Sequence, residues 1–123
     1  MNIYEYQKEC SRTCPDLKGK EFDQMHMAMG ASTEANELLD AYKKWFAYGK
    51  PIDLVNVKEE IFDTFWYLVN LCRMLEIDLE AGMENNIAKL RKRFPDKFSQ
   101  YDATHRDLDA ERKILETGNT GIK

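Results

Sequence analysis

Two pairs of acidic residues with the same internal spacing stand out in the first half of the sequence. Glu34 and Glu37 form one pair, and Glu60 and Asp63 form the other after an interval of 22 residues. Residues three positions apart share one face of a helix, so two antiparallel helices can bring all four carboxylates together. Repulsion among these carboxylates requires a cation, and an all-oxygen ligand set suits Mg²⁺, with Mn²⁺ as a substitute, better than zinc.

Acidic pairs of this kind also occur without magnesium, on solvated helix faces and in di-iron sites. Glutamate and aspartate most often mark the solvated face of an amphipathic helix, but here they share the only polar strip of a mostly apolar helix with Asn56, Tyr67 and Asn70. A ferritin-like di-iron site needs histidine three residues after a glutamate, and none of these glutamates has one. The pattern therefore favours a magnesium site for phosphate chemistry, because carboxylate-held Mg²⁺ keeps positions for water and phosphate oxygens.

The spacing of apolar residues predicts an all-α fold. We expect helices over residues 2–13, 21–47, 53–76, 78–94 and about 104–115. Gly49 and Pro51 end the first long helix in the expected order, and Asp53 and Asp78 are suitable N-caps for the two helices that follow. The two helices with the acidic pairs are therefore neighbours in sequence, joined by a short loop.

Two features outside the regular pattern carry further expectations. Gly30 interrupts a helix at a cost of about 1 kcal/mol relative to alanine, and it lies on the strip of Glu34 and Glu37, so we expect it to permit close helix approach and to leave room for a ligand. Near the end of the chain, Thr104 and Asp107 resemble a capping box. Residues 117–123 have no apolar periodicity, and we expect them to be frayed.

Length and composition limit the class of protein. A chain of 123 residues predicts one small domain whose helices finish burying their apolar faces against a second subunit. The net charge of −4 and a pI near 5.2 argue against a nucleic-acid polymer as partner. No signal-peptide pattern and no run of about 18–20 apolar residues is present, so we expect a cytoplasmic protein without membrane association. The three cysteines fit no zinc pattern and are interpreted as free thiols.

The ordered set of acidic residues resembles the signature of the MazG-like, all-α nucleoside triphosphate pyrophosphohydrolases. That signature is Glu-x-x-Glu, an interval of a dozen to nearly thirty residues, and then Glu-x-x-Asp. A later segment, in which Asn86, Lys89 and Arg93 precede Pro95, also resembles the family. The resemblance covers about residues 22–98, and residues 99–123 form a C-terminal tail outside it. It implies a single MazG-like domain built as a four-helix bundle, completed by homo-oligomerisation and followed by a short C-terminal helix.

The resemblance also implies an activity and roles for individual residues. Members hydrolyse a nucleoside triphosphate between the α and β phosphates, which gives the monophosphate and pyrophosphate, and they are homodimers or homotetramers in which a neighbouring subunit completes the site. The implied site residues are the catalytic and metal-binding Glu34, Glu37, Glu60 and Asp63, and the substrate-binding Asn86, Lys89, Arg93 and Trp66. Trp45 and Phe46 are further candidates for stacking on the base, although aromatic residues at helical spacing more often belong to the core.

Two hypotheses of different classes follow. The first is a Mg²⁺-dependent hydrolase that converts (deoxy)nucleoside triphosphates to monophosphate and pyrophosphate and serves nucleotide-pool house-cleaning. The second is a catalytically inactive helical module for oligomerisation or regulation, which keeps the fold without turnover. Release of pyrophosphate in the presence of Mg²⁺ separates the two hypotheses.

Overall fold

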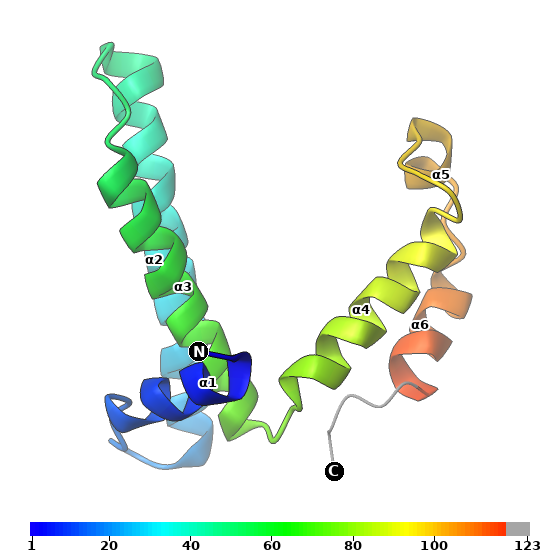
Figure 1. The fold of residues 1–123 in the computed structure, drawn as a ribbon, viewed down its shortest axis with the longest axis horizontal. Coiled ribbons are helices and arrows are strands. Elements are labelled where there is room, and N and C mark those ends of the chain that lie inside the picture. Colours follow the sequence, from blue (N-terminus) through cyan, green and yellow to red (C-terminus); the bar gives the residue numbers. More distant parts are fainter. Residues whose placement is uncertain (118–123) are drawn as a thin grey trace. The chain divides into compact units, whose positions relative to one another are not determined.

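The computed structural model describes residues 1–117, and every regular element in this range is a helix (Figure 1). The helices are α1 (Ile3–Arg12), α2 (Lys20–Tyr48), α3 (Leu54–Met74), α4 (Leu79–Arg93), α5 (Gln100–Thr104) and α6 (Leu108–Thr117). The all-α prediction is confirmed. None of these helices combines the length and apolar character needed to cross a membrane. The fraying predicted for the C-terminal end falls, beyond Thr117, outside the described residues.

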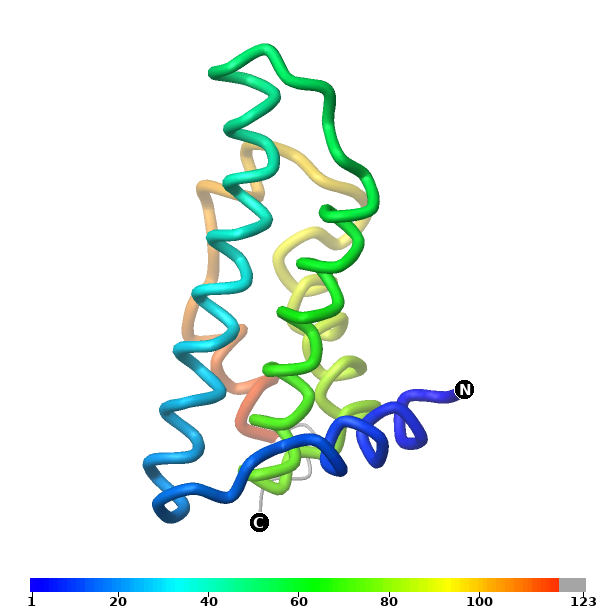
Figure 2. The backbone as a smooth tube through the Cα atoms, turned by 90° about the vertical axis from the view of Figure 1, so that its left-hand side faces the viewer, coloured from blue at the N-terminus to red at the C-terminus, as the bar shows by residue number. Residues whose placement is uncertain are grey.

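The chain divides into two compact units, Met1–Leu75 and Glu76–Lys123, and each is described by itself. The prediction of a single domain over residues 1–123 stays a prediction. In the first unit, α2 and α3 form an antiparallel hairpin, which Figures 1 and 2 both show. Gly49 ends α2 in the left-handed region with a φ of 65°, and the Asp53 carboxylate accepts hydrogen bonds from the backbone N–H groups at the start of α3. Both predicted helix ends are thereby confirmed.

Helix α1 packs against α3 through specific contacts. The Asn70 side-chain amide donates to the Cys10 carbonyl oxygen at 3.4 Å, and the rings of Tyr6 and Phe65 stack with their centroids 5.4 Å apart. Asn70 is completely buried, so this hydrogen bond satisfies a polar group that burial would otherwise penalise. Contacts with α1 therefore occupy one side of α3, next to its acidic strip. All three cysteines are free thiols, as predicted.

The first unit leaves much apolar surface uncovered. Several apolar residues of α2 and α3 are exposed, and we call six of them the apolar face: Leu39, Tyr42, Phe46, Leu54, Ile61 and Leu68. Helical periodicity places the three α2 members on one face of α2 and the three α3 members on one face of α3. Isolated exposed apolar side chains are ordinary, but a continuous face of them marks an interaction surface.

The second unit is held together by a buried ion pair. Glu111 of α6 is 2% exposed, and its carboxylate accepts from the Nε of Arg93 in α4 at 2.7 Å and from the Nε of Arg106 at 3.0 Å. Asn85 of α4 adds a hydrogen bond to the Leu115 carbonyl oxygen at 3.1 Å. The C-terminal segment therefore folds back on α4 through polar contacts.

Two local expectations for this unit were wrong. Helix α5, capped by Ser99, was not predicted, because five residues are too short to show an apolar period. The proposed capping box at Thr104 does not form, since Thr104 ends α5 and its hydroxyl bonds to carbonyl oxygens of that helix. The last helix begins at Leu108, and the Asp107 carboxylate accepts from the Ala110 N–H at 3.0 Å. Asp107 is thus the N-cap residue of α6 and not the acidic partner of an N-cap at Thr104.

Candidate metal centre

Three of the four predicted carboxylates meet between α2 and α3. Among the described residues, Glu34, Glu37 and Glu60 each offer a carboxylate oxygen, and these oxygens all lie within 4.8 Å of one another. Glu60 is 6% exposed, Glu34 is half-buried and Glu37 is exposed. We call these three residues the acidic cluster. Burial of the three side chains decreases from Glu60 on α3 to Glu37 on α2. One side of the cluster is therefore open to an incoming ligand.

The electrostatics of Glu60 show that the cluster lacks a counter-charge. Burial, followed by the neighbouring carboxylates of Glu34 and Glu37, raises the pKa of Glu60 to about 7. Its buried Oε2 has no hydrogen-bond partner. A buried carboxylate normally has a donor or a cation, because an unpaired one is costly. A divalent cation supplies what this arrangement lacks, so the residues present fit the metal that the sequence predicts.

Asp63, the fourth predicted ligand, lies one turn further along the same strip of α3. Its side chain is exposed, and it is not a member of the acidic cluster. Its charge nevertheless acts on two half-buried tyrosines, since it contributes, after burial and other neighbours, to the raised pKa values of Tyr6 and Tyr67. A role for Asp63 in metal binding and catalysis stays a prediction.

The predicted phosphate-binding residues belong to α4 in the second unit. Asn86 is exposed and Lys89 is half-buried. The side chain of Arg93 is 19% exposed and is engaged by Glu111, whereas Lys89 has no ion-pair partner within residues 1–117. Their participation in one site with the acidic cluster stays a prediction.

Trp66 contacts protein groups on two sides. Its Nε1 donates to the Thr13 hydroxyl at 3.2 Å, and its ring meets the ring of Tyr67 edge-on, with centroids 4.9 Å apart and planes at 87°. These contacts fix Trp66 at the end of α1. The proposed stacking of a nucleotide base on Trp66 stays a prediction.

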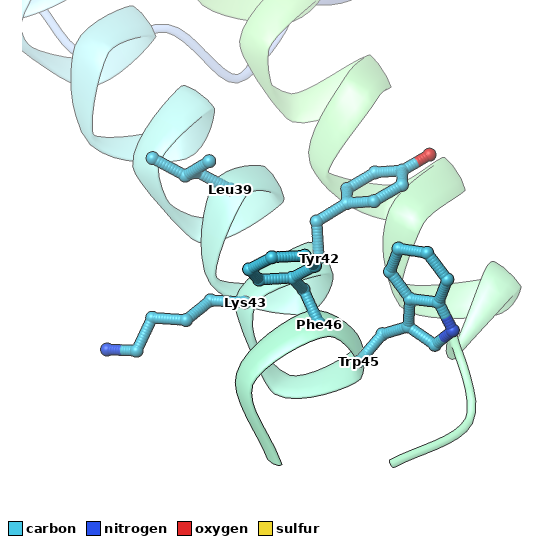
Figure 3. Close-up of a pocket in the computed structure, with 5 residues that line it drawn as sticks. All are labelled: Leu39, Tyr42, Lys43, Trp45 and Phe46. Carbon is cyan, nitrogen blue, oxygen red and sulfur yellow. The ribbon is translucent and has the colours of Figure 1, made fainter. Parts of the chain in front are cut away.

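A second aromatic feature lies on the last turns of α2 (Figure 3). There a shallow apolar hollow of about 430 Å³ is lined by five residues: Leu39, Tyr42, Lys43, Trp45 and Phe46. The sequence pattern singles out Trp45 and Phe46 for stacking but assigns Leu39 and Tyr42 to an apolar helix stripe. Their exposure is missed because helical periodicity identifies such a stripe without showing which partner covers it.

Comparison with known families agrees with the geometry. The family model described as the MazG nucleotide pyrophosphohydrolase domain matches residues 22–98, which include both acidic pairs and the Asn86 to Pro95 segment. The chain belongs to this family. The resemblance is thus confirmed over the same residues that carry it in the sequence. The comparisons of the chain with curated proteins and with solved structures found no match. The family assignment indicates a hydrolase that acts on nucleotide pyrophosphate bonds.

Proposed function

We propose that this protein is a Mg²⁺-dependent hydrolase that converts nucleoside triphosphates to the monophosphate and pyrophosphate. The observation that carries the proposal is Glu60, a buried carboxylate that lies beside two others and whose Oε2 has no hydrogen-bond partner. Such a group has an unfavourable charge interaction, which either protonation or a bound cation relieves. Membership of the MazG family supports a triphosphate as the other ligand of the bound cation.

Glu34, Glu37 and Glu60 would hold the metal, with Asp63 as a fourth oxygen donor. Carboxylate oxygens match the preference of Mg²⁺, and of Mn²⁺ as a substitute. When bound, the ion would neutralise charge on the phosphate oxygens and acidify a water. The carboxylate donors would be in place before substrate binds, since Glu60 and Glu34 lie between two packed helices.

The proposed reaction is the attack of water on the α phosphorus. The bond between that phosphorus and the oxygen bridging to the β phosphate breaks, pyrophosphate leaves, and a carboxylate of the acidic cluster accepts the proton from the water. Glu37 suits this last role because it is the exposed member of the cluster. A proton acceptor must reach the attacking water directly or through one further water.

In the second unit, the proposed substrate-binding residues lie on α4. Lys89 and Asn86 would bind phosphate or sugar, and Lys89 would do so as a point charge without a competing carboxylate. Arg93 would contribute less, because its guanidinium already pairs with Glu111. Trp66, or the hollow at Trp45 and Phe46, would stack on the base.

We further propose that a second copy of the chain covers the apolar face, which gives a homodimer or, through two such pairs, a homotetramer. Two hairpins facing each other would form the four-helix bundle implied by the sequence. Light scattering of the purified protein measures the mass directly. Ile61→Glu introduces a charge into the face, and we expect it to give monomers, whereas a Glu59→Gln control on the exposed side of α3 leaves the assembly unchanged.

Activity is tested by incubating the protein with each common ribonucleoside and deoxyribonucleoside triphosphate, with and without Mg²⁺, and by measuring pyrophosphate. We expect pyrophosphate only with Mg²⁺, and we expect preference for particular nucleotides to identify the house-cleaning role. Glu60→Gln removes one charge from the cluster and is expected to lower turnover more than about 100-fold, since even outer-shell changes cost 10–100-fold. Glu59→Gln is the matched control. No pyrophosphate from any nucleotide would support the inactive helical module instead.

A further inference from the structure

The acidic cluster depends on how α2 and α3 are aligned. Glu37 follows Gly30 by seven positions on α2, and Tyr67 follows Glu60 by seven positions on α3. In the antiparallel hairpin, Gly30 lies against the ring of Tyr67, while Glu37 meets Glu60. At 1.5 Å per residue, the Gly30–Tyr67 contact and the acidic cluster lie about 10 Å apart along the helix pair. Both therefore depend on the same alignment of α2 with α3.

Gly30 is buried, and its contact with Tyr67 tolerates no side chain. A Cβ at position 30 would overlap three atoms of the Tyr67 ring, namely Cε1, Cδ1 and Cζ. By contrast, a Cβ at the other helical glycine, Gly82, would make only an ordinary contact with Ile77 at 3.7 Å. The close contact with the Tyr67 ring thus explains why a residue of low helix propensity stands at position 30.

The Tyr67 ring cannot easily move out of the way. Trp66 meets it edge-on, with centroids 4.9 Å apart, and Trp66 is itself tied to Thr13 by a hydrogen bond. On α2, the ring of His26 faces Tyr67 at 6.1 Å and 64°. Tyr67 is thus held by its own helix, by α2 and, through Trp66, by the end of α1, so a side chain at position 30 would displace α2 and not the ring.

We propose that Tyr67 is a positioning residue that sets the register of α2 against α3 by lying in the notch at Gly30, and that this register brings Glu34 and Glu37 to Glu60. The inference rests on the proposed metal site and adds the element that assembles it. A slip of one residue would shift a side chain by about 1.5 Å and rotate it by about 100°. Misplacement of about 1 Å costs on the order of 100-fold in a positioned site.

The test measures Mn²⁺ binding to the full chain by electron paramagnetic resonance, together with helix content and melting temperature. Propensity alone predicts that Gly30→Ala stabilises α2. We expect the opposite outcome, with Mn²⁺ affinity reduced roughly 10–100-fold while helix content is retained. Gly82→Ala is the matched control and is expected to leave Mn²⁺ affinity unchanged. Tyr67→Phe keeps the ring and is expected to bind Mn²⁺ within about two-fold of the wild type, because register depends on ring volume and not on the hydroxyl.

A double variant keeps the proposal testable if Gly30→Ala folds poorly. Tyr67→Ala removes the ring, and adding Gly30→Ala to it should cause no further loss of affinity, because the residues that conflict are no longer both present. Additive losses would overturn the proposal, as would Mn²⁺ affinity in Gly30→Ala equal to that of the wild type. Absence of Mn²⁺ binding in the wild type would instead overturn the proposed metal site, and this inference with it.

Discussion

Two glutamates, Glu60 and Glu111, are almost completely buried, and their surroundings are opposite in sign. Glu111 is 2% exposed and lies between the guanidinium groups of Arg93 and Arg106. Glu60 is 6% exposed and lies beside the carboxylates of Glu34 and Glu37. One carboxylate has two cations within the protein, and the other has only like charges around it.

The titration behaviour follows these surroundings. Burial by itself raises the pKa of Glu111, but hydrogen bonds from Arg106 and Arg93 outweigh it and lower the pKa below its ordinary value. Burial raises the pKa of Glu60 to about 7, and the adjacent carboxylates add to that shift. The comparison separates a carboxylate whose charge is compensated within the chain from one whose compensation, in the proposed function, comes from a bound cation.

The largest effect on stability is expected from Glu111→Gln, which leaves two arginines without their shared carboxylate. Breaking a buried ion pair in this way is expected to lower the melting temperature by roughly 10 °C. The matched control is Glu116→Gln, because Glu116 pairs with Arg112 on the exposed surface of the same helix. Exposed pairs contribute little, so the control is expected to melt within about 1 °C of the wild type. Equal effects of both variants would contradict a structural role for Glu111.

Removal of the divalent ion is expected to have the next largest effect, and only at the acidic cluster. A ligand at 100 times its dissociation constant stabilises a folded protein by about 2.7 kcal/mol. We therefore expect Mg²⁺ to raise the denaturation midpoint of the wild type and EDTA to reverse the change. Glu111→Gln should keep this response to Mg²⁺, whereas Glu60→Gln should lose it. A Mg²⁺ response retained in Glu60→Gln would place the ion elsewhere.

A smaller effect with the opposite sign is expected for Glu60→Gln in the absence of metal. The substitution removes one charge from a cluster of like charges, so we expect the metal-free variant to melt a few degrees above the wild type at pH 8. Differential scanning calorimetry in EDTA measures this difference. Destabilisation would mean that Glu60 has a favourable partner that its surroundings do not suggest.

The smallest predicted effects concern pH, and they differ in sign between the two glutamates. The pKa of Glu60 is raised in the folded protein from 4.5 to about 7, so between these pH values the folded state binds more protons than the unfolded state. The stability that protonated Glu60 contributes is therefore lost as pH rises from about 4.5 to about 7. The pKa of Glu111 is lowered, so its contribution is present above the ordinary carboxyl range and is lost as pH falls.

Urea denaturation of the metal-free protein between pH 3 and pH 8 tests both signs. Relative to wild type, Glu60→Gln should remove the loss of stability that occurs between about pH 5 and pH 7. Glu111→Gln should remove part of the loss on the acidic side. A stability profile of Glu60→Gln parallel to that of the wild type would contradict the raised pKa of Glu60.

Much of the local structure was predictable because it depends on neighbouring residues. The first four helices were predicted with bounds within two residues of those observed, and the caps at Asp53 and Asp78 formed as expected. Helix α5 was missed, and the start of α6 was assigned to the wrong cap. Both errors lie after α4, where the helices are too short to show a clear apolar period.

The sequence by itself determined which residues share a helix face, and hence that Glu34 and Glu37 lie on one strip and Glu60 and Asp63 on another. Only the tertiary structure decided that Glu60 is buried against the first pair while Asp63 is exposed. It also decided that Arg93 pairs with Glu111, a residue 18 positions away. The physical reason is that helical periodicity fixes directions around an axis, whereas burial and charge compensation depend on which helix packs on that side and at what register.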